Sequence, residues 1–558
     1  MKYKRLGDLL LSVELISEEQ LNEALALQKQ SKDRLGKVLI DNGFITEGQL
    51  IEALRMQLGI DFIDLTKTVI PAEMVEQLPK SIAKKHGVVP VKLVKDTLYL
   101  AMKDPLNFMA VEEVRSATKK KVIPLIASEH AVEHSISALY GNEGAAKAMA
   151  QMREESGFRP EEATTDVYNE ENSAPTIRLV NSIIERAVSE RSSDIHFEPS
   201  EGNMRVRMRI DGRLHNILEI PKDLQESVIS RLKVMGRMDI SERRVPQDGR
   251  AEVQLKSNTI DFRMSTLPTI FGEKMVIRLL SRNGELQDRA GIGLMGEDSK
   301  KMDKLLSNTS GVILIVGPTG SGKSSTMSTM IRELINEETN LITLEDPVEY
   351  NIEGTTQVQI NEKTGLTFAA GLRAILRQDP DVISIGEIRD GETAEIAMRA
   401  AMTGHLVIST IHTEDAVSAI DRLRDMGIEP YLIAGGLRGI ISQRLVRRIC
   451  DNCKEEYQPD PEQCSLVGID PMQVRTFYRG KGCPMCFHSG YRGRIGVFEI
   501  MNVNSEMRGA ITHGATVQEL RQTLTKTDFV PMIKSGDILV EKGITTVEEL
   551  FSALGGIE

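Results

Sequence analysis

The segment from Gly317 to Ser324 reads GPTGSGKS and has the spacing of a phosphate-binding loop. An apolar run precedes it and a helical pattern follows it, which is the context in which such a loop binds a nucleotide. Backbone N–H groups of the turn can close on phosphate oxygens, and the helix N-terminus adds partial positive charge. We expect Lys323 to reach the β- and γ-phosphates and Ser324 to place its hydroxyl on Mg²⁺. The expected ATP-binding residues are Gly317, Pro318, Thr319, Gly320, Ser321, Gly322, Lys323, Ser324 and Ser325.

Acidic residues end two of the apolar runs that follow this loop. LITLEDPVEY supplies Glu345 and Glu349, and DPDVISIGEIRD ends its apolar run at Gly386-Glu387. Hydrolysis needs one acid on the metal side and another that orients or deprotonates the attacking water. Gly386 stands where a Walker B motif usually has Asp, so Glu387 is the candidate for the metal side. A solvated loop would also account for Glu345 and Glu349, because acidic residues are mostly exposed.

Two histidines, His405 and His412, flank a short apolar run at 406–411. A histidine in such a place serves structure as readily as catalysis. The residues alone leave both interpretations open.

Four of the five cysteines form two pairs with metal-site spacing. Cys450/Cys453 and Cys483/Cys486 are separated by 29 residues. Two CxxC knuckles bring four thiolates within tetrahedral reach, which predicts a closed structural Zn²⁺ site. The alternatives are buried free cysteines or a redox dithiol, although neither pair opens a thioredoxin-like βαβ unit. Cys464 lies between the pairs without a partner and is expected to take no part.

Apolar periodicity predicts the elements that must position these groups. From 283 onward, β-branched runs alternate with helical stretches, as in the buried parallel strands of an α/β domain. Residues 61–140 contain two predicted strands and a helix, and residues 173–282 mix a helix with alternating strands, so two α+β units are expected. The stretch 141–172 is polar and acidic and predicts a linker.

The first 60 residues contain a repeat. RLGDLLLSVELISEEQLNEALALQ at 5–28 and RLGKVLIDNGFITEGQLIEALRMQ at 34–57 are identical at 12 of 24 positions. Each copy predicts two short helices, with Ser17 or Thr46 as an N-cap and a glutamine three residues later. Two packed amphipathic hairpins would explain the leucines but not the shared Arg-Leu-Gly opening. Two copies suit a ligand with two similar halves, whose phosphates or guanine edges arginines could grip.

Bulk composition excludes several classes of protein. A chain of 558 residues is too long for one core and predicts three or four domains. A net charge of −12 and the absence of Trp argue against a wholly cationic nucleic-acid binder and against an aromatic stacking platform. No apolar run reaches about 18 residues and no signal peptide opens the chain, so we expect a cytoplasmic protein without a transmembrane segment.

Several ordered motifs resemble those of the type II/type IV secretion ATPase family. GPTGSGKSS, ITLEDPVEY, DPDVISIGEIRD and MTGHLVISTIHT match its motor, and SSDIHFEP, RVRMRIDGRL, RRVPQDGRAEV and STLPTIFGEKMVIRLL match the domain that precedes the motor. The resemblance covers essentially the whole chain. It implies an α/β multidomain protein with a RecA-like P-loop ATPase core, preceded by a PAS-like α+β domain and an N-terminal helical and α+β regulatory domain. The expected domains are 1–140 (regulatory), 141–172 (linker), 173–282 (α+β) and 283–558 (ATPase, with the zinc module at 450–486).

This resemblance also implies a homohexameric ring in which each subunit holds ATP between its two halves. It places the general base at Glu349, the Mg²⁺ side at Glu387 and the conserved box histidine at His412, with His405 close by. Arginines of the preceding domain approach the phosphates, and Arg207 and Arg209 are the candidates because RxRxDG projects alternate side chains from one strand face. These residues, with Lys323, form the expected catalytic set.

The cysteine quartet bears on which machine the motor serves. In the family it occurs in pilus-assembly and secretion ATPases, and retraction motors as a rule lack it. We therefore expect an ATPase that powers type IV pilus assembly by acting on an inner-membrane platform protein. The alternatives are a type II secretion ATPase, a nucleic-acid translocase on the same fold, and a regulatory protein that rarely hydrolyses its nucleotide.

The tandem repeat resembles the cyclic-di-GMP-binding N-terminal domain of the same family. Glu14 departs from the pattern, because the second copy has Gly43 at that position, and a carboxylate there could weaken binding to phosphates. A scaffold without a ligand is the alternative. The residues that match the pattern are Arg5, Leu6, Gly7, Leu10 and Gln28 in the first copy, and Arg34, Leu35, Gly36, Leu39, Gly43 and Gln57 in the second.

Overall fold

The protein is described here by a computed structural model. Its chain forms two compact units, the first made mainly by residues before 280 and the second by the remainder. Among the described residues, no helix is long and apolar enough to cross a membrane. The structure describes every residue except 1–5, 14, 32–34, 46–48, 51–52, 54, 56–59, 67, 69, 106, 130, 137–138, 141–148, 150–173, 256–257, 282–287, 459–464, 466–475 and 555–558.

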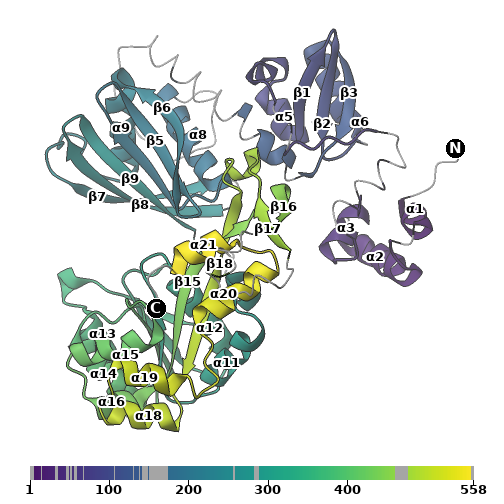
Figure 1. The fold of residues 1–558 in the computed structure, drawn as a ribbon. Helices are drawn as coiled ribbons and strands as arrows, with labels where there is room; N and C mark the ends of the chain where they lie inside the picture. The colour runs from purple at the N-terminus through teal and green to yellow at the C-terminus, as the bar shows by residue number, and fades with distance from the viewer. Residues whose placement is uncertain are drawn as a thin grey trace. The chain divides into compact units, whose positions relative to one another are not determined.

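Among the described residues, three helices carry the repeats (Figure 1): α1 (Leu6–Ser12), α2 (Glu18–Ser31) and α3 (Leu35–Asp41). The predicted cap of the first copy is confirmed. The Ser17 N–H donates to Gln20 Oε1 at 2.9 Å, and the Gln20 N–H donates to Ser17 Oγ at 3.2 Å. Thr46, the corresponding residue of the second copy, lies outside the described residues.

The next region is a three-stranded sheet with helices, and the predicted strand–strand–helix succession is confirmed. β1 and β2 pair antiparallel, whereas β2 and β3 pair parallel through a crossover that contains α6. Asn107 begins α6 because its side chain accepts the N–H of Ala110. The elements are η1 (Ala72–Gln77), α5 (Lys80–His86), β1 (Val88–Val94), β2 (Thr97–Met102), α6 (Phe108–Thr118) and β3 (Lys121–Ile126).

A six-stranded sheet with the order β6-β5-β4-β9-β8-β7 completes the first unit. Its strands alternate: Met204, Val206 and Met208 of β5 are buried, while the arginines between them are exposed or half-buried. One face therefore forms the core and the other is charged. The elements are α8 (Pro175–Ser189), β4 (Asp194–Pro199), β5 (Asn203–Ile210), β6 (Arg213–Pro221), α9 (Lys222–Met235), β7 (Gln247–Leu255), β8 (Asn258–Thr269) and β9 (Gly272–Ser281).

The second unit is the expected α/β domain, built on a seven-stranded sheet with the order β12-β11-β13-β14-β10-β15-β18. β18 runs antiparallel to β15, and the other strands are parallel. Each face has its own core: Leu314 and Val316 of β10 pack with α13–α16, α18 and α19, whereas Ile313 and Ile315 pack with α10–α12 (Figure 1). Burial on both faces explains the unbroken apolar runs of its central strands.

The helices and strands of this unit run as follows: α10 (Arg289–Ile292), α11 (Gly296–Leu306), β10 (Gly311–Val316), α12 (Lys323–Leu334), β11 (Leu341–Glu345), β12 (Thr356–Gln359), η2 (Glu362–Thr364), α13 (Phe368–Ile375), β13 (Val382–Ile385), α14 (Gly391–Met402), β14 (Leu406–Ile411), α15 (Ala416–Asp425), α16 (Pro430–Gly436), β15 (Leu437–Ile449), η3 (Asp451–Cys453), β16 (Lys454–Tyr457), β17 (Phe477–Gly480), η4 (Pro484–Cys486), β18 (Tyr491–Asn502), α18 (Ser505–Thr512), α19 (Val517–Leu524), α20 (Met532–Glu541) and α21 (Val547–Leu554).

Candidate nucleotide site and cysteine cluster

The phosphate-binding loop joins β10 to α12, as the sequence predicts. A Cβ at Gly317 would lie 2.4 Å from the carbonyl oxygen of Gln443, so only glycine fits there. Lys323 Nζ donates to the carbonyl oxygens of Gly317 at 2.9 Å and of Pro318 at 3.1 Å. The Oγ of Ser321 is buried without a hydrogen-bond partner in the described part of the chain. A phosphate oxygen would satisfy this hydroxyl, so the loop fits a phosphate-bearing ligand.

Four neighbouring parallel strands bring the predicted site residues to one edge of the sheet. β11, β13, β14 and β10 lie side by side, and Glu349, Glu387, His412 and Lys323 follow their carboxyl ends in that order. His412 is central to the group. Its Nδ1 lies 3.5 Å from Lys323 Nζ, and its Nε2 lies 3.3 Å from Glu387 Oε2.

The electrostatics of the site centre on Lys323. Burial lowers the pKa of Lys323; Glu387 opposes that shift, Arg444 adds to it, and Glu349 opposes it. Glu349 and Glu387, two of the acids that the sequence singled out, therefore favour the charged form of this partly desolvated ammonium group. An anionic phosphate would compensate the burial of this charge, which is the role expected of a P-loop lysine.

The two acids of the LEDPVEY segment differ in their surroundings. Glu345 Oε1 accepts hydrogen bonds from Thr343 Oγ1 at 2.6 Å and from Gln357 Nε2 at 3.0 Å, so this carboxylate ties β11 to β12. Glu349 is exposed on the loop that follows β11. The arrangement gives Glu345 a structural role and leaves Glu349 available for chemistry.

Arg389 is a site residue that the sequence reasoning missed. It donates through Nε to Glu387 Oε1 at 2.8 Å, and its Nη1 lies 3.6 Å from Asp346 Oδ2. It therefore links the acidic ends of β13 and β11. Its position two residues after Glu387 in GEIRD was the available signal.

The expectation that His405 lies close to His412 is wrong. The six residues of β14 separate them, and at about 3.3 Å per residue this strand is roughly 20 Å long. His405 Nδ1 lies 3.0 Å from the carbonyl oxygen of Ala400 and 3.3 Å from Thr403 Oγ1. It hydrogen-bonds the end of α14, which is a structural role.

Arg207 and Arg209 lie on the charged face of the six-stranded sheet, each beside a carboxylate of β4. Arg207 Nη2 lies 2.7 Å from Glu198 Oε2. Arg209 Nε lies 3.6 Å from Asp194 Oδ2, and its Nη1 donates to the carbonyl oxygen of Gly212 at 2.9 Å. The predicted common strand face is confirmed, and a role toward a nucleotide stays a prediction.

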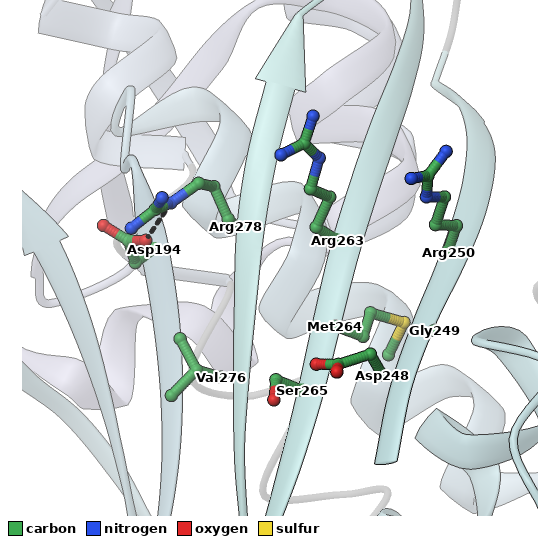
Figure 2. Close-up of a pocket in the computed structure, with 9 residues that line it drawn as sticks. All are labelled: Asp194, Asp248, Gly249, Arg250, Arg263, Met264, Ser265, Val276 and Arg278. Carbon is green, nitrogen blue, oxygen red and sulfur yellow. Dashed lines mark hydrogen bonds and ion pairs between the residues drawn. The ribbon is translucent and has the colours of Figure 1, made fainter. Parts of the chain in front are cut away.

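Three further arginines share that face. Figure 2 shows Arg278, Arg263 and Arg250 projecting from β9, β8 and β7. All three line a cavity of about 380 Å³. Arg278 Nε donates to Asp194 Oδ1 at 3.0 Å. These arginines were not singled out from the sequence, because each stands in a separate motif and only the antiparallel register aligns them.

The four paired cysteines converge on one point. Their sulfur atoms all lie within 4.8 Å of one another, and Cys453 Sγ and Cys486 Sγ are 3.9 Å apart. Backbone N–H groups of Gly482 and Gly490 donate to Cys453 Sγ and Cys486 Sγ, each at 3.3 Å. Four cysteine sulfurs this close together, with backbone N–H donors to two of them, fit a tetrahedral zinc site. Cys464 lies outside the described residues.

Comparison with known proteins identifies this architecture. The family described as "Type II/IV secretion system protein" matches residues 169–552. The chain belongs to this family. Its P-loop unit has the RecA-like fold of this family's motors, and the protein is an ATPase. A second match, to the MshEN domain, covers residues 58–146.

Two relatives align along 86% or more of the chain. The type IV pilus assembly ATPase PilB of Myxococcus xanthus is 39% identical over 554 residues, with 98% of each chain covered. The type II secretion system protein E of Pseudomonas aeruginosa is 41% identical over 488 residues, which are 86% of this chain and 96% of that protein. The crystal structure of the Legionella pneumophila ATPase DotB has the same fold, with a TM-score of 0.51 and 20% identity over 72% of this chain and 98% of that one.

The repeat residues that the structure describes mostly form a small core. Gly7 packs against Leu21 and Gly36 against Leu50, and a Cβ added at either glycine would lie 2.9 Å from that leucine. Leu10 and Leu39 are fully buried, so they support the helices rather than face solvent. Leu6, Gln28, Leu35 and Gly43 are also described, whereas Arg5, Glu14, Arg34 and Gln57 lie outside the described residues.

Proposed function

We propose that this ATPase powers type IV pilus assembly as a cytoplasmic homohexamer that acts on an inner-membrane platform protein. The observation that supports this most is the alignment with PilB of Myxococcus xanthus over 98% of both chains, N-terminal region included. The cysteine cluster agrees with it, because the resemblance to the family implies that this module belongs to assembly and secretion motors rather than to retraction motors. The expected domains, 1–140, 141–172, 173–282 and 283–558, are part of this proposal.

The arrangement of the site supports separate roles for its residues in phosphate binding, metal binding and base catalysis. The loop N–H groups and Lys323 bind the phosphates, and Ser324 with Glu387 provides the oxygen donors that Mg²⁺ prefers. When bound, Mg²⁺ neutralises developing charge on the phosphates. Glu349 is the general base, and His412 links Lys323 to Glu387.

The assignment of the base is tested with Glu349→Gln, which keeps the shape of the side chain but removes its basicity. We expect kcat to fall by about 10²–10⁴-fold with ATP binding retained. Glu353→Gln changes another exposed glutamate of the same loop and is the matched control. Full turnover by Glu349→Gln would remove Glu349 from the mechanism.

The machine is tested by deleting the gene in the source strain and scoring surface pili and secreted proteins separately. Loss of pili with normal secretion supports the proposal. Loss of secretion with normal pili favours the alternative, a type II secretion ATPase that drives pseudopilus assembly, which the 41% identity to the Pseudomonas aeruginosa protein supports. Stimulation of ATP hydrolysis by DNA, with steep salt dependence, would instead favour a nucleic-acid translocase.

We further propose that cyclic-di-GMP regulates the motor through its N-terminal region. Two observations support this: the MshEN match at residues 58–146, and the two repeats that directly precede it at 5–28 and 34–57. A ligand with two similar halves suits two similar copies. Calorimetric titration of cyclic-di-GMP should give heat with the wild type and none with Arg34→Ala. Absence of heat with the wild type ends this part of the proposal and leaves the repeats as a scaffold.

A further inference from the structure

The loop formed by residues 412–415, here called the His412 loop, accepts hydrogen bonds from two arginine side chains that are outside the expected catalytic set. Arg444 Nη2 donates to the carbonyl oxygen of Glu414 at 2.7 Å. Arg521 Nη2 donates to Asp415 Oδ2 at 2.7 Å. The loop therefore has fixed points on β15 and α19, close to the residue that contacts Lys323.

Glu499 of β18 holds the end of the same loop. Its side chain is nearly inaccessible, and its Oε1 accepts the N–H of Ala416, the first residue of α15, at 3.0 Å. Its Oε2 accepts the N–H of Met532, the first residue of α20, at 3.4 Å. One buried carboxylate thus joins the start of the helix after the His412 loop to the start of a C-terminal helix.

Arg444 connects this carboxylate to the nucleotide site. It is 9% exposed, and burial lowers the pKa of its guanidinium, with Glu499, Glu414 and Asp415 opposing the shift. The same guanidinium lowers the pKa of Lys323, so its charge acts on the phosphate-binding lysine as well. Arg444 therefore lies within electrostatic range of both Glu499 and Lys323.

We propose that Glu499 and Arg444 are positioning residues for ATP hydrolysis, which keep His412 within reach of Lys323 and Glu387 and tie that position to helix α20. A force or a partner that displaces α20 would then move the His412 loop and change the turnover rate. This inference rests on the proposed function, because it takes the His412 loop to be part of the hydrolysis site.

The test compares Glu499→Gln with Glu549→Gln in the full chain. An amide offers only one acceptor oxygen, so Glu499→Gln loses one of its two backbone contacts. We expect kcat to fall about tenfold with KM changed less than about twofold, since small displacements of catalytic groups reduce rate strongly. Hydrogen exchange at the Ala416 or Met532 amide should also accelerate.

Glu549 is the matched control because it is a half-buried carboxylate that accepts from Arg447 of β15 without contact to the His412 loop. Glu549→Gln should keep wild-type kcat. Equal losses of kcat in both variants, or no loss in Glu499→Gln, would overturn the inference. Arg444→Lys should recover part of the kcat that Arg444→Ala loses, and equal kcat in these two variants also counts against positioning.

His412→Ala separates failure of this inference from failure of the proposed site. If His412→Ala lowers kcat and Glu499→Gln does not, only the positioning role fails. If His412→Ala keeps full turnover, the loop is not part of the hydrolysis site and both proposals about it fall.

Discussion

Removal of zinc from the cysteine cluster should loosen the hairpin β16–β17 and leave the ATPase core folded. The cluster joins the end of β15 to the segment before β18, and the N–H groups of Gly482 and Gly490 donate to its sulfurs. The two apolar clusters around the seven-stranded sheet contain none of the four cysteines. Loss of the metal therefore removes a local constraint rather than the core.

The geometry shows that a zinc ion fits the cluster, and mass action gives the size of the effect. Zn–S bonds of about 2.3 Å give sulfur–sulfur edges of about 3.8 Å in a tetrahedron. Cys453 and Cys486 are already 3.9 Å apart, and all four sulfurs lie within 4.8 Å, so an ion fits with small movements. A ligand present at about 1,000 times its dissociation constant stabilises the bound state by about 4.1 kcal/mol. Its removal should accelerate exchange of the protected amides by up to about 10³-fold.

The assay combines elemental analysis with hydrogen exchange. The purified protein should contain one zinc ion per chain, and a chelator should accelerate exchange at Gly482 and Gly490 but not in β10 or β14. Cys483→Ala should lose the metal, and Cys464→Ser, the control for cysteine replacement, should retain it. Metal-free protein whose Gly482 and Gly490 amides remain protected, or zinc retained by Cys483→Ala, would refute the reasoning.

Three other perturbations follow from the same contacts. Lys323→Met should lower ATP turnover by at least about 10²-fold. Its thermal midpoint at neutral pH should stay within about 2 °C of wild type, because burial already disfavours the charged lysine. A large drop in the midpoint would contradict this. Burial raises the pKa of Glu499 above its ordinary value of 4.5, so between 4.5 and the raised pKa the native state holds a proton that the unfolded state has lost, and the contribution of Glu499 to stability should fall as pH rises through this range. The thermal midpoint of Glu499→Gln should lack this decline, and parallel pH profiles would argue against it. Gly36→Ala should speed amide exchange in α3, because the added Cβ would lie 2.9 Å from Leu50 Cδ2. Such overpacking costs about 1–3 kcal/mol. Unchanged exchange would show that Leu50 adapts.

Local signals were sufficient where the chemistry is contained in a short segment. The phosphate-binding loop needs only a strand, a glycine turn and a helix start, and all three are adjacent in the chain. The capping pair Ser17–Gln20 and the CxxC knuckles are equally short-range, and both were predicted correctly. The second repeat copy shows the limit, because Thr46 lies outside the described residues and its cap stays a prediction.

The order of the strands determines which of the predicted site residues lie next to one another, and the motifs alone do not show this. His405 and His412 are near in sequence but lie at opposite ends of β14, so only His412 reaches the edge of the sheet that carries the P-loop. Arg389 can contact both Glu387 and Asp346 because β13 lies beside β11. In the other sheet, register aligned Arg278, Arg263 and Arg250 from three motifs. Periodicity indicates which face a side chain takes, but not which strand lies next to it.

By itself, the sequence determined the elements, the P-loop, the cysteine quartet and the acids at strand ends, because turn chemistry and apolar spacing act over a few residues. Only the tertiary structure decided that His412 contacts both Lys323 and Glu387, and that Glu499 joins α15 to α20. Those contacts connect residues separated by tens of positions or more, and the order of the parallel strands and the packing of the C-terminal helices create them. Backbone N–H groups at helix starts require acceptors, and which buried carboxylate meets that need depends on the packed fold.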